Sequence, residues 1–359
     1  MEESMKKLGK ITAVLLCFIL LSTSFGNPAI AASAWLEWTE TGNYYNYCPS
    51  YIANSDTERF MYYCKNQTAG QIVDYIYMRR ITGSGSSWTW GTPSVALAPS
   101  ATGWDSVHVC DPDVKKGSFL FNSHTYSYAM FYLGCDQLDN NHNQIGVAFS
   151  DSLYGPWVKW SGNPLITFTS TSQWGVGQPS ATSVDGKGRM LLFYSRGDSA
   201  GTRMVRRDIN LANMSSPTIG GEVTVPTNGL TESDGSSVIL HNGALAYDAA
   251  TDRFYLVRPR HPFETTDPSY VSSSLQVAYT SGATIWNGTG TWTIEGHIKP
   301  AQSGKARNHN STLLTDVWGN LKGGANSYQV NFTGSDVGSF PGNLWTYRIY
   351  GIGKASLVQ

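Results

Sequence analysis

The chain has 359 residues, only 14% of them are charged, and its formal net charge at pH 7 is −1. No basic patch or charge run departs from this balance, which argues against nucleic acid or another polyanion as the partner. The 12 tryptophans and 20 tyrosines suit a surface that stacks on and hydrogen-bonds to neutral sugars, although the strands of any extracellular β-protein favour aromatic residues as well.

The first 34 residues have the pattern of a secretory signal peptide. Three lysines precede an apolar run over residues 11–21, and small residues suited to cleavage follow at residues 29–34. That run is too short to span a bilayer comfortably, and no later stretch is apolar enough to do so. We therefore expect a secreted, extracellular protein without a membrane span, in which residues 35–359 form a single domain.

Short strand patterns fill the rest of the chain, and helix signals are almost absent. Segments such as "FMYYC", "AMFYLGC", "MLLFYSR" and "RFYLVRP" are rich in aromatic and β-branched residues and are bounded by turn residues. The strands repeat as a unit of about four, and the last is often marked by Trp, as in "GSSWTWG", "YGPWVKW" and "GTGTWTI". The units start near five residues: Pro49, Pro112, Pro179, Asn242 and Asn310.

The starts of successive units lie 63, 67, 63 and 68 residues apart. A period of this size with four strands per unit predicts an all-β fold, a five-bladed β-propeller of four-stranded antiparallel blades. One blade cannot bury both faces of its sheet, so the five blades should form one cooperative domain. A pair of β-sandwiches is the alternative, and the regular spacing favours the propeller.

Four cysteines remain after the predicted signal peptide: Cys48, Cys64, Cys110 and Cys135. An even number in an exported chain permits two disulfides, and three pairings are possible. Cys48 and Cys64 flank one hairpin pattern, and Cys110 and Cys135 flank the corresponding segment downstream. This symmetry favours the two local pairs. No cysteine or histidine cluster has zinc spacing.

A short phrase recurs at the start of each unit, and its polar residue changes from unit to unit. To within one residue of register, the position is held by Cys48, Asp111, Gln178, His241 and His309. The innermost strands of a propeller line its axis, so these side chains should gather at one funnel. Each blade would then contribute a different chemical group to that funnel.

The motifs "CDPDV", "YAMFYLGCD", "IGVAFSDSLYGPWVKW" and "RNHNSTLLTDVWGNL" resemble those of five-bladed propeller glycosidases, above all the family 43 glycoside hydrolases and their relatives. This resemblance implies inverting hydrolysis by carboxyl groups at the funnel: a base Asp, an Asp that tunes and orients, and a general-acid Glu. The matching positions hold Cys48, Asp111 and Gln178, so only one carboxyl group is retained. The expected catalytic carboxyl groups are therefore either lost or supplied by acidic residues elsewhere in the chain.

Carboxyl groups on the loops before the inner strands are the remaining candidates. We take Asp111, Glu232 and Asp105 as catalytic candidates. Asp111 would orient the substrate or act as the base, and Glu232 or Asp105 would supply the second carboxyl group, because a Glu held against an aromatic wall can have the raised pKa of a general acid. The competing interpretations are a structural Asp111 that caps backbone N–H groups and a solvated loop acid for Glu232. His241 is a further candidate for the acid, as His is in a few relatives. The expected substrate-binding residues are Trp104, Trp174, Gln178, His241, Arg307 and His309.

The resemblance also implies a calcium ion on the axis, with His309 facing a water that the ion binds, although no cofactor is expected to be required. Calcium prefers oxygen ligands, so we do not expect His309 to bind the ion directly, and we assign no metal ligand. The leading hypothesis is a secreted, monomeric glycosidase acting on an extracellular polysaccharide or oligosaccharide. A carbohydrate-binding propeller that has lost its acid/base pair is the alternative.

Overall fold

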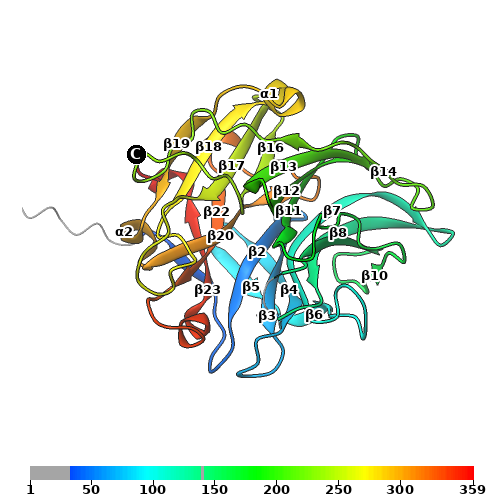
Figure 1. Cartoon of the computed structure of the whole chain (residues 1–359), viewed down its shortest axis with the longest axis horizontal. Coiled ribbons are helices and arrows are strands. Elements are labelled where there is room, and N and C mark those ends of the chain that lie inside the picture. The colour runs from blue at the N-terminus through cyan, green and yellow to red at the C-terminus, as the bar shows by residue number, and fades with distance from the viewer. Residues whose placement is uncertain (1–32, 139–140) are drawn as a thin grey trace, which may run out of the picture. The chain divides into compact units, whose positions relative to one another are not determined.

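The computed structural model describes residues 33–138 and 141–359, which form five antiparallel β-sheets arranged around a common axis as a five-bladed propeller (Figure 1). The predicted fold is confirmed. The predicted signal peptide lies outside the described residues apart from its last two. No helix in the described part of the chain has the length and apolar character needed to cross a membrane.

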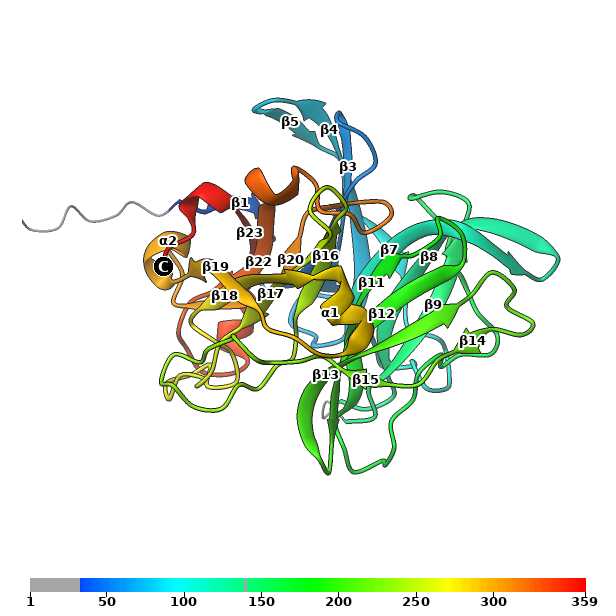
Figure 2. The same cartoon turned by 90° about the horizontal axis from the view of Figure 1, so that it is seen from above.

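The sheets follow one another along the chain, and four of the five inner strands coincide with the predicted unit starts. Blade 1 contains β2 (Asn46–Ala53), β3 (Glu58–Asn66), β4 (Asp74–Ser84) and β5 (Ser87–Trp90), with β6 (Ser94–Leu97) beside β4 and β21 (Thr315–Asp316) beside β2. Blade 2 contains β7 (His108–Phe121), β8 (His124–Cys135), β9 (Gln144–Ser150) and β10 (Val158–Lys159). In Figure 2 the β4–β5 hairpin projects from the body of the molecule.

Blade 3 contains β11 (Gly175–Ser183), β12 (Arg189–Asp198), β13 (Gly201–Asn210), β14 (Thr218–Ile219) and β15 (Val223–Thr224). Blade 4 contains β16 (Ala244–Asp248), β17 (Arg253–Pro259), β18 (Leu275–Ser281) and β19 (Thr293–Ile298), with the short helix α1 (Gly282–Asn287) after β18. The remaining helices are α2 (Pro300–Ser303), η1 (Gly324–Asn326), η2 (Gly342–Thr346) and η3 (Lys354–Ser356).

Blade 5 joins the two ends of the described chain. Its strands are β20 (Arg307–Leu313), β22 (Gln329–Ser335), β23 (Arg348–Gly353) and, from the N-terminal end, β1 (Trp35–Trp38). The outermost strand of the last blade therefore precedes the first blade in sequence. The sequence "WLEW" has the tryptophans of the other outer strands, and β1 closes the ring by hydrogen bonding to β23.

The hydrophobic core lies between the blades. One cluster joins Phe60 and Tyr62 of blade 1 to Val114 and Met130 of blade 2, and four further clusters join the other neighbours around the ring, including blade 5 to blade 1. Because both faces of a sheet are covered by neighbouring blades, strands such as β12 are apolar without alternation. This packing explains why a single repeat cannot fold alone.

A β-bulge interrupts the inner strand in four of the five blades, at the recurring phrase. The ladder register shifts between Tyr47 and Ser50, between Cys110 and Asp113, between Gly177 and Ser180, and between His309 and Thr312. The residue with positive φ is Cys48, Asp111, Gln178, Asn242 or Asn310, with φ from 42° to 56°. Such a backbone is uncommon for residues other than Gly, and its repetition turns one polar side chain per blade toward the axis end. In blades 4 and 5 the equivalent residue is the asparagine, one position after the predicted His241 and His309.

The disulfide pairing expected from the symmetric hairpins is wrong. Cys64 on β3 bonds to Cys110 on β7, so the bridge joins blade 1 to blade 2 instead of closing a hairpin within a blade. Cys48 remains a thiol. The Cys135 sulfur contacts the carbonyl oxygens of Gln137 and Asn141.

Candidate functional site

A cavity of about 900 Å³ opens at the bulged ends of the inner strands, and we call it the axial cavity. Every blade contributes to its wall. The polar and aromatic side chains of the wall include Tyr45, Tyr47, Asp74, His108, Trp174, Gln178, His241, Asn242, His261, His309, Asn310 and Tyr347. Of the predicted substrate-binding residues, Trp174, Gln178, His241 and His309 therefore line one common cavity. Among the described residues of the wall, Asp74 is the only one with a carboxylate side chain.

Asp111 is not itself a lining residue: it lies behind the wall, hydrogen-bonded to the lining residue Gln178, and is almost fully buried. Its Oδ1 accepts the Cys48 S–H at 2.8 Å, and its Oδ2 accepts the backbone N–H of Gln178 at 3.2 Å. The three bulge residues thus link blades 1, 2 and 3. Burial raises the pKa of the Asp111 carboxyl to about 6, the two hydrogen bonds oppose this rise, and the charge of Asp74 adds to it.

A cluster of two tyrosines and one histidine holds Asp74 at the start of β4. Tyr45 donates its hydroxyl to Oδ1 in a very short hydrogen bond, and Tyr47 donates to Oδ2 at 2.7 Å. The backbone N–H of Asp74 is bonded to His108 Nδ1 at 3.1 Å. Two hydroxyl donors aimed at one carboxylate fix its orientation at the cavity wall.

Histidines form the opposite part of the wall. His241 Nε2 and His261 Nε2 are 2.8 Å apart, so one ring donates to the other. Burial, followed by the nearby His261 and Arg258, lowers the pKa of His241 to about 3. Burial also lowers the pKa of His261. Both rings are therefore neutral near pH 7 and offer a hydrogen-bonding pair instead of positive charge.

Replacing His241 by Gln should weaken the acid sensitivity of the fold. The unfolded chain takes up a proton at this histidine near pH 6.5, whereas the folded protein does so only near pH 3, so stability falls as the pH drops below 6.5. We expect urea unfolding to show about 2 kcal/mol less loss between pH 7 and pH 5 in His241→Gln than in the wild type. Equal losses in both proteins would contradict a buried neutral His241.

Glu232 lies one layer behind the wall. Its side chain is fully buried, and Oε1 pairs with Arg258 at 2.9 Å. The same carboxylate accepts the backbone N–H of Ile239 and of His261, both of which line the cavity. These contacts give Glu232 a positioning role at this wall, through Ile239 and His261.

Asp105, Trp104 and Arg307 lie outside the cavity wall as well. Asp105 is buried against Lys159 at 2.6 Å and accepts the Tyr132 hydroxyl. Trp104 packs on Gly134 and Gly146 of the neighbouring strands, where an added Cβ would lie within 2.7 Å of its ring. Arg307 donates to Thr266 and Pro268 and holds the loop after β17 in place.

Some residues of the wall could not be predicted from the recurring phrase, because they do not lie on inner strands. Asp74 begins the third strand of blade 1, and His261 follows the second strand of blade 4. Both line the axial cavity although neither lies on an inner strand. The loop after the apolar strand β17 contains His261, and binding residues often lie on such loops.

Several solved structures with the same fold are glycoside hydrolases. A family 117 glycoside hydrolase produced by the marine bacterium Zobellia galactanivorans matches with a TM-score of 0.55 and 13% identity over 91% of each chain. The GH43_1 enzyme from Xanthomonas citri matches with a TM-score of 0.54 and 15% identity over 90% of this chain and 92% of that chain. It has also been determined with xylose and with xylotriose.

A β-xylosidase/α-arabinofuranosidase of family 43 from a compost microbial metagenome, in complex with xylotriose and in calcium-free form, matches with a TM-score of 0.53 and 14% identity over 89% of this chain and 94% of that chain. No protein-family model matches the chain, and no curated protein sequence is similar to it. The likenesses show that the chain has the propeller fold of families 43 and 117, as the sequence motifs predicted.

Proposed function

We propose that this chain is a secreted glycosidase-like propeller that binds a neutral saccharide in the axial cavity and hydrolyses an O-glycosidic bond there. The observation that carries the proposal is the carboxyl pair of Asp111 and Asp74 beside one aromatic cavity. Their environments differ, which is the arrangement that separates an acid from a base. Export is supported by the N-terminal sequence pattern and by the disulfide between Cys64 and Cys110.

Asp111 is the proposed proton donor. With a pKa of about 6, it holds a proton in mildly acidic solution and releases it to a leaving-group oxygen as the bond breaks. The backbone N–H of Gln178 and the Cys48 thiol then stabilise the carboxylate that remains. Gln178 itself carries no transferable proton at this pH, so its proposed role is to bind Asp111 and substrate.

Asp74 is the proposed base. From its place in the wall, it would accept a proton from a water that attacks the anomeric carbon, while Tyr45 and Tyr47 keep its oxygens in place. An inverting course, which the family resemblance implies, needs room for that water between the carboxylate and the sugar. The anomer of the first product, followed by NMR, tests this step separately.

The chemistry of the wall favours a neutral saccharide. Among the described residues that line the axial cavity there is no Lys or Arg to pair with a carboxylate or sulfate group. Asn242, Asn310 and the histidine pair offer hydrogen-bond donors and acceptors without charge. Trp174 offers a flat apolar face for a sugar ring.

Replacing Trp174 by Ala should weaken saccharide binding about tenfold, which corresponds to about 1.4 kcal/mol, because the stacking face is lost. Isothermal titration calorimetry on the best oligosaccharide from a binding array measures the change. Trp286→Ala is the matched control, because Trp286 is exposed and is not part of the cavity wall. Equal affinity of the two variants would contradict sugar stacking on Trp174.

The axial residues also fit a hydrated calcium ion. His309 Nδ1 donates to Asn310 Oδ1 at 2.6 Å, so Nε2 is left as an acceptor, and it is buried without a hydrogen-bonding partner among the described residues. Gln178 Oε1 is a second buried acceptor of this kind. These atoms would hold the ion through its waters. The ion would supply positive charge at the axis.

A saccharide-binding propeller without hydrolysis is the second candidate. The specific observation in its favour is that Cys48 and Gln178 occupy the positions where the family resemblance expects carboxyl groups. In addition, Asp105 and Glu232 are each engaged in a buried ion pair. Under this reading Asp111 and Asp74 are polar members of a binding wall.

A substrate screen separates the two candidates. The protein is incubated with arabinan, xylan, galactan, fructan and host-type glycans, and release of reducing sugar is measured alongside binding. Hydrolysis that is lost in Asp111→Asn and in Asp74→Asn supports the enzyme. Binding of a neutral glycan without release of sugar by the wild type supports the binding propeller, and neither binding nor release would overturn both.

A further inference from the structure

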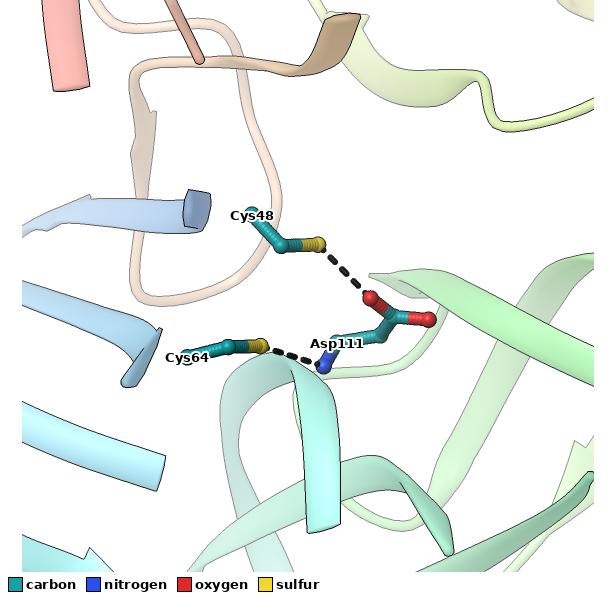
Figure 3. A group of neighbouring side chains, drawn as sticks. All are labelled: Cys48, Cys64 and Asp111. Carbon is teal, nitrogen blue, oxygen red and sulfur yellow. Dashed lines mark hydrogen bonds between the residues drawn. The ribbon is translucent and has the colours of Figure 1, made fainter. Parts of the chain in front are cut away.

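The axis holds a thiol beside a disulfide. Cys48 lies in the bulge of β2, and Cys64, on the paired strand β3, lies opposite Tyr47. The sulfurs of Cys48 and Cys64 and a carboxylate oxygen of Asp111 all lie within 4.8 Å of one another (Figure 3). Because the Cys64 sulfur is bonded to Cys110, this group is a poor metal site. It contains the parts of a thiol–disulfide exchange instead.

We propose that Cys48 exchanges with this disulfide, so that the bridge moves between Cys64–Cys110 and Cys48–Cys64. The Cys48 thiol loses its proton, and its sulfur attacks the Cys64 sulfur. The new bond forms as the Cys64–Cys110 bond breaks, and Cys110 leaves as a thiolate that takes up a proton. One disulfide and one thiol are present before and after the step, so no oxidant or reductant is consumed.

Asp111 is placed to carry the proton between the two thiols. Its Oδ1 accepts the Cys48 S–H at 2.8 Å and lies 3.5 Å from the sulfur of Cys110. The same oxygen can therefore take the proton from the attacking sulfur and return it to the leaving sulfur. The backbone N–H of Asp111 contacts the Cys64 sulfur at 3.1 Å, so this segment of β7 contacts all three sulfurs.

The two bridges hold the propeller differently. Cys64–Cys110 joins β3 of blade 1 to β7 of blade 2, whereas Cys48–Cys64 joins two neighbouring strands within blade 1. The exchange therefore releases the covalent link between blades 1 and 2. It also removes the Cys48 S–H from Asp111 and leaves a Cys110 thiol beside the same carboxyl group. The exchange thus acts on the axial carboxyl group and on the joint between two blades.

The rate of exchange should rise with pH. Burial, and then the neighbouring Asp111, raise the pKa of the Cys48 thiol, and Asp74 adds to this effect, so the attacking thiolate is scarce at neutral pH. Below that pKa, each pH unit increases the thiolate population up to tenfold. Exchange should therefore be slow near pH 6 and much faster near pH 9.

Peptide mapping tests the proposal in the full chain, in which Cys17 of the N-terminal apolar run is replaced by Ser so that it cannot take part in the exchange. Samples held at pH 6 and pH 9 without reductant are quenched in acid, alkylated with N-ethylmaleimide, digested and examined by mass spectrometry. We expect a Cys48–Cys64 peptide and alkylated Cys110 to increase with time at pH 9. At pH 6, where the thiolate is scarcest and the Asp111 carboxyl group must take the proton, Asp111→Asn should slow this change about tenfold, whereas Cys135→Ser should leave it unchanged. A bridge that stays at Cys64–Cys110 at every time and pH would overturn the proposal.

A second variant tests the same geometry even if the isomer is a minor species. In Cys110→Ser, Cys64 has lost its partner, so oxidised glutathione should drive formation of the Cys48–Cys64 bridge within each molecule. A mixed glutathione disulfide on Cys64 with Cys48 still alkylatable would show that the two sulfurs cannot meet, and would overturn the exchange. Both readouts are masses of peptides, so they do not depend on the proposed hydrolysis.

Discussion

Asp111→Asn should lower kcat by about 10²–10⁴-fold, because the amide cannot give a proton to the leaving group. The wild-type rate should be highest below pH 6 and should fall as the pH rises through the pKa of Asp111, which is about 6. Initial rates on the substrate found in the screen, measured from pH 4 to pH 9, check both expectations. An exposed carboxyl group such as Asp151, replaced by Asn, is the control.

The same substitution should make the protein more stable above pH 6. The unfolded chain releases the Asp111 proton near pH 3.8 and the folded protein only near pH 6, so the wild type loses stability as the pH rises between these values. The loss corresponds to roughly 3 kcal/mol, and Asn avoids it because it carries no charge. The amide can still accept the Gln178 N–H and donate to the Cys48 sulfur.

A gain in stability together with a loss of turnover would show that the Asp111 carboxyl group lowers the stability of the fold and is needed for catalysis. Full activity in Asp111→Asn would contradict its role as proton donor. A wild-type rate that increases between pH 6 and pH 8 would do the same.

Glu232→Gln should cost about 3–5 kcal/mol of stability, because it leaves Arg258 buried without a counter-charge. Arg258 has no exposed surface, and Glu232 is its carboxylate partner within the described chain. Its other hydrogen bonds go to neutral groups: the Gln276 side chain, the Thr231 carbonyl and the Pro259 carbonyl. Thermal unfolding should show a decrease of roughly 5–15 °C in Tm.

Asp234→Asn is the matched control, because Asp234 lies on the same loop and is exposed. It should change Tm by no more than a few degrees, since it removes a surface carboxylate that bonds to the Ser236 backbone. If Glu232→Gln kept the wild-type Tm and still abolished turnover, Glu232 would be a catalytic group and its positioning role would be refuted.

The fold could be predicted from the sequence because propeller blades are local. Each blade is a meander whose strands are consecutive in the chain, so their spacing and the Trp-bearing outer strands are visible without knowledge of distant contacts. The exception is blade 5, whose outer strand β1 comes from residues 35–38 and pairs with β23 at the other end of the chain. Ring closure is a long-range contact, and a repeat count does not reveal it.

The site was only partly predictable, because some of its residues are brought together by contacts between distant parts of the chain. The recurring phrase identified Cys48, Asp111 and Gln178, but the left-handed residue of blades 4 and 5 is Asn242 or Asn310, one position after the His of the phrase. Asp74 was not identified because it begins a third strand and reaches the axis through the fold of the loops. The Cys64–Cys110 bridge crosses between blades, and local symmetry pointed to other pairs.

A crystal structure of Asp111→Asn soaked with the best neutral oligosaccharide tests the central claim most directly. The account predicts a sugar ring stacked on Trp174, with the oxygen of the scissile bond next to residue 111 and the anomeric carbon facing Asp74. A saccharide bound on the outer strands, with an empty axial cavity, would contradict it.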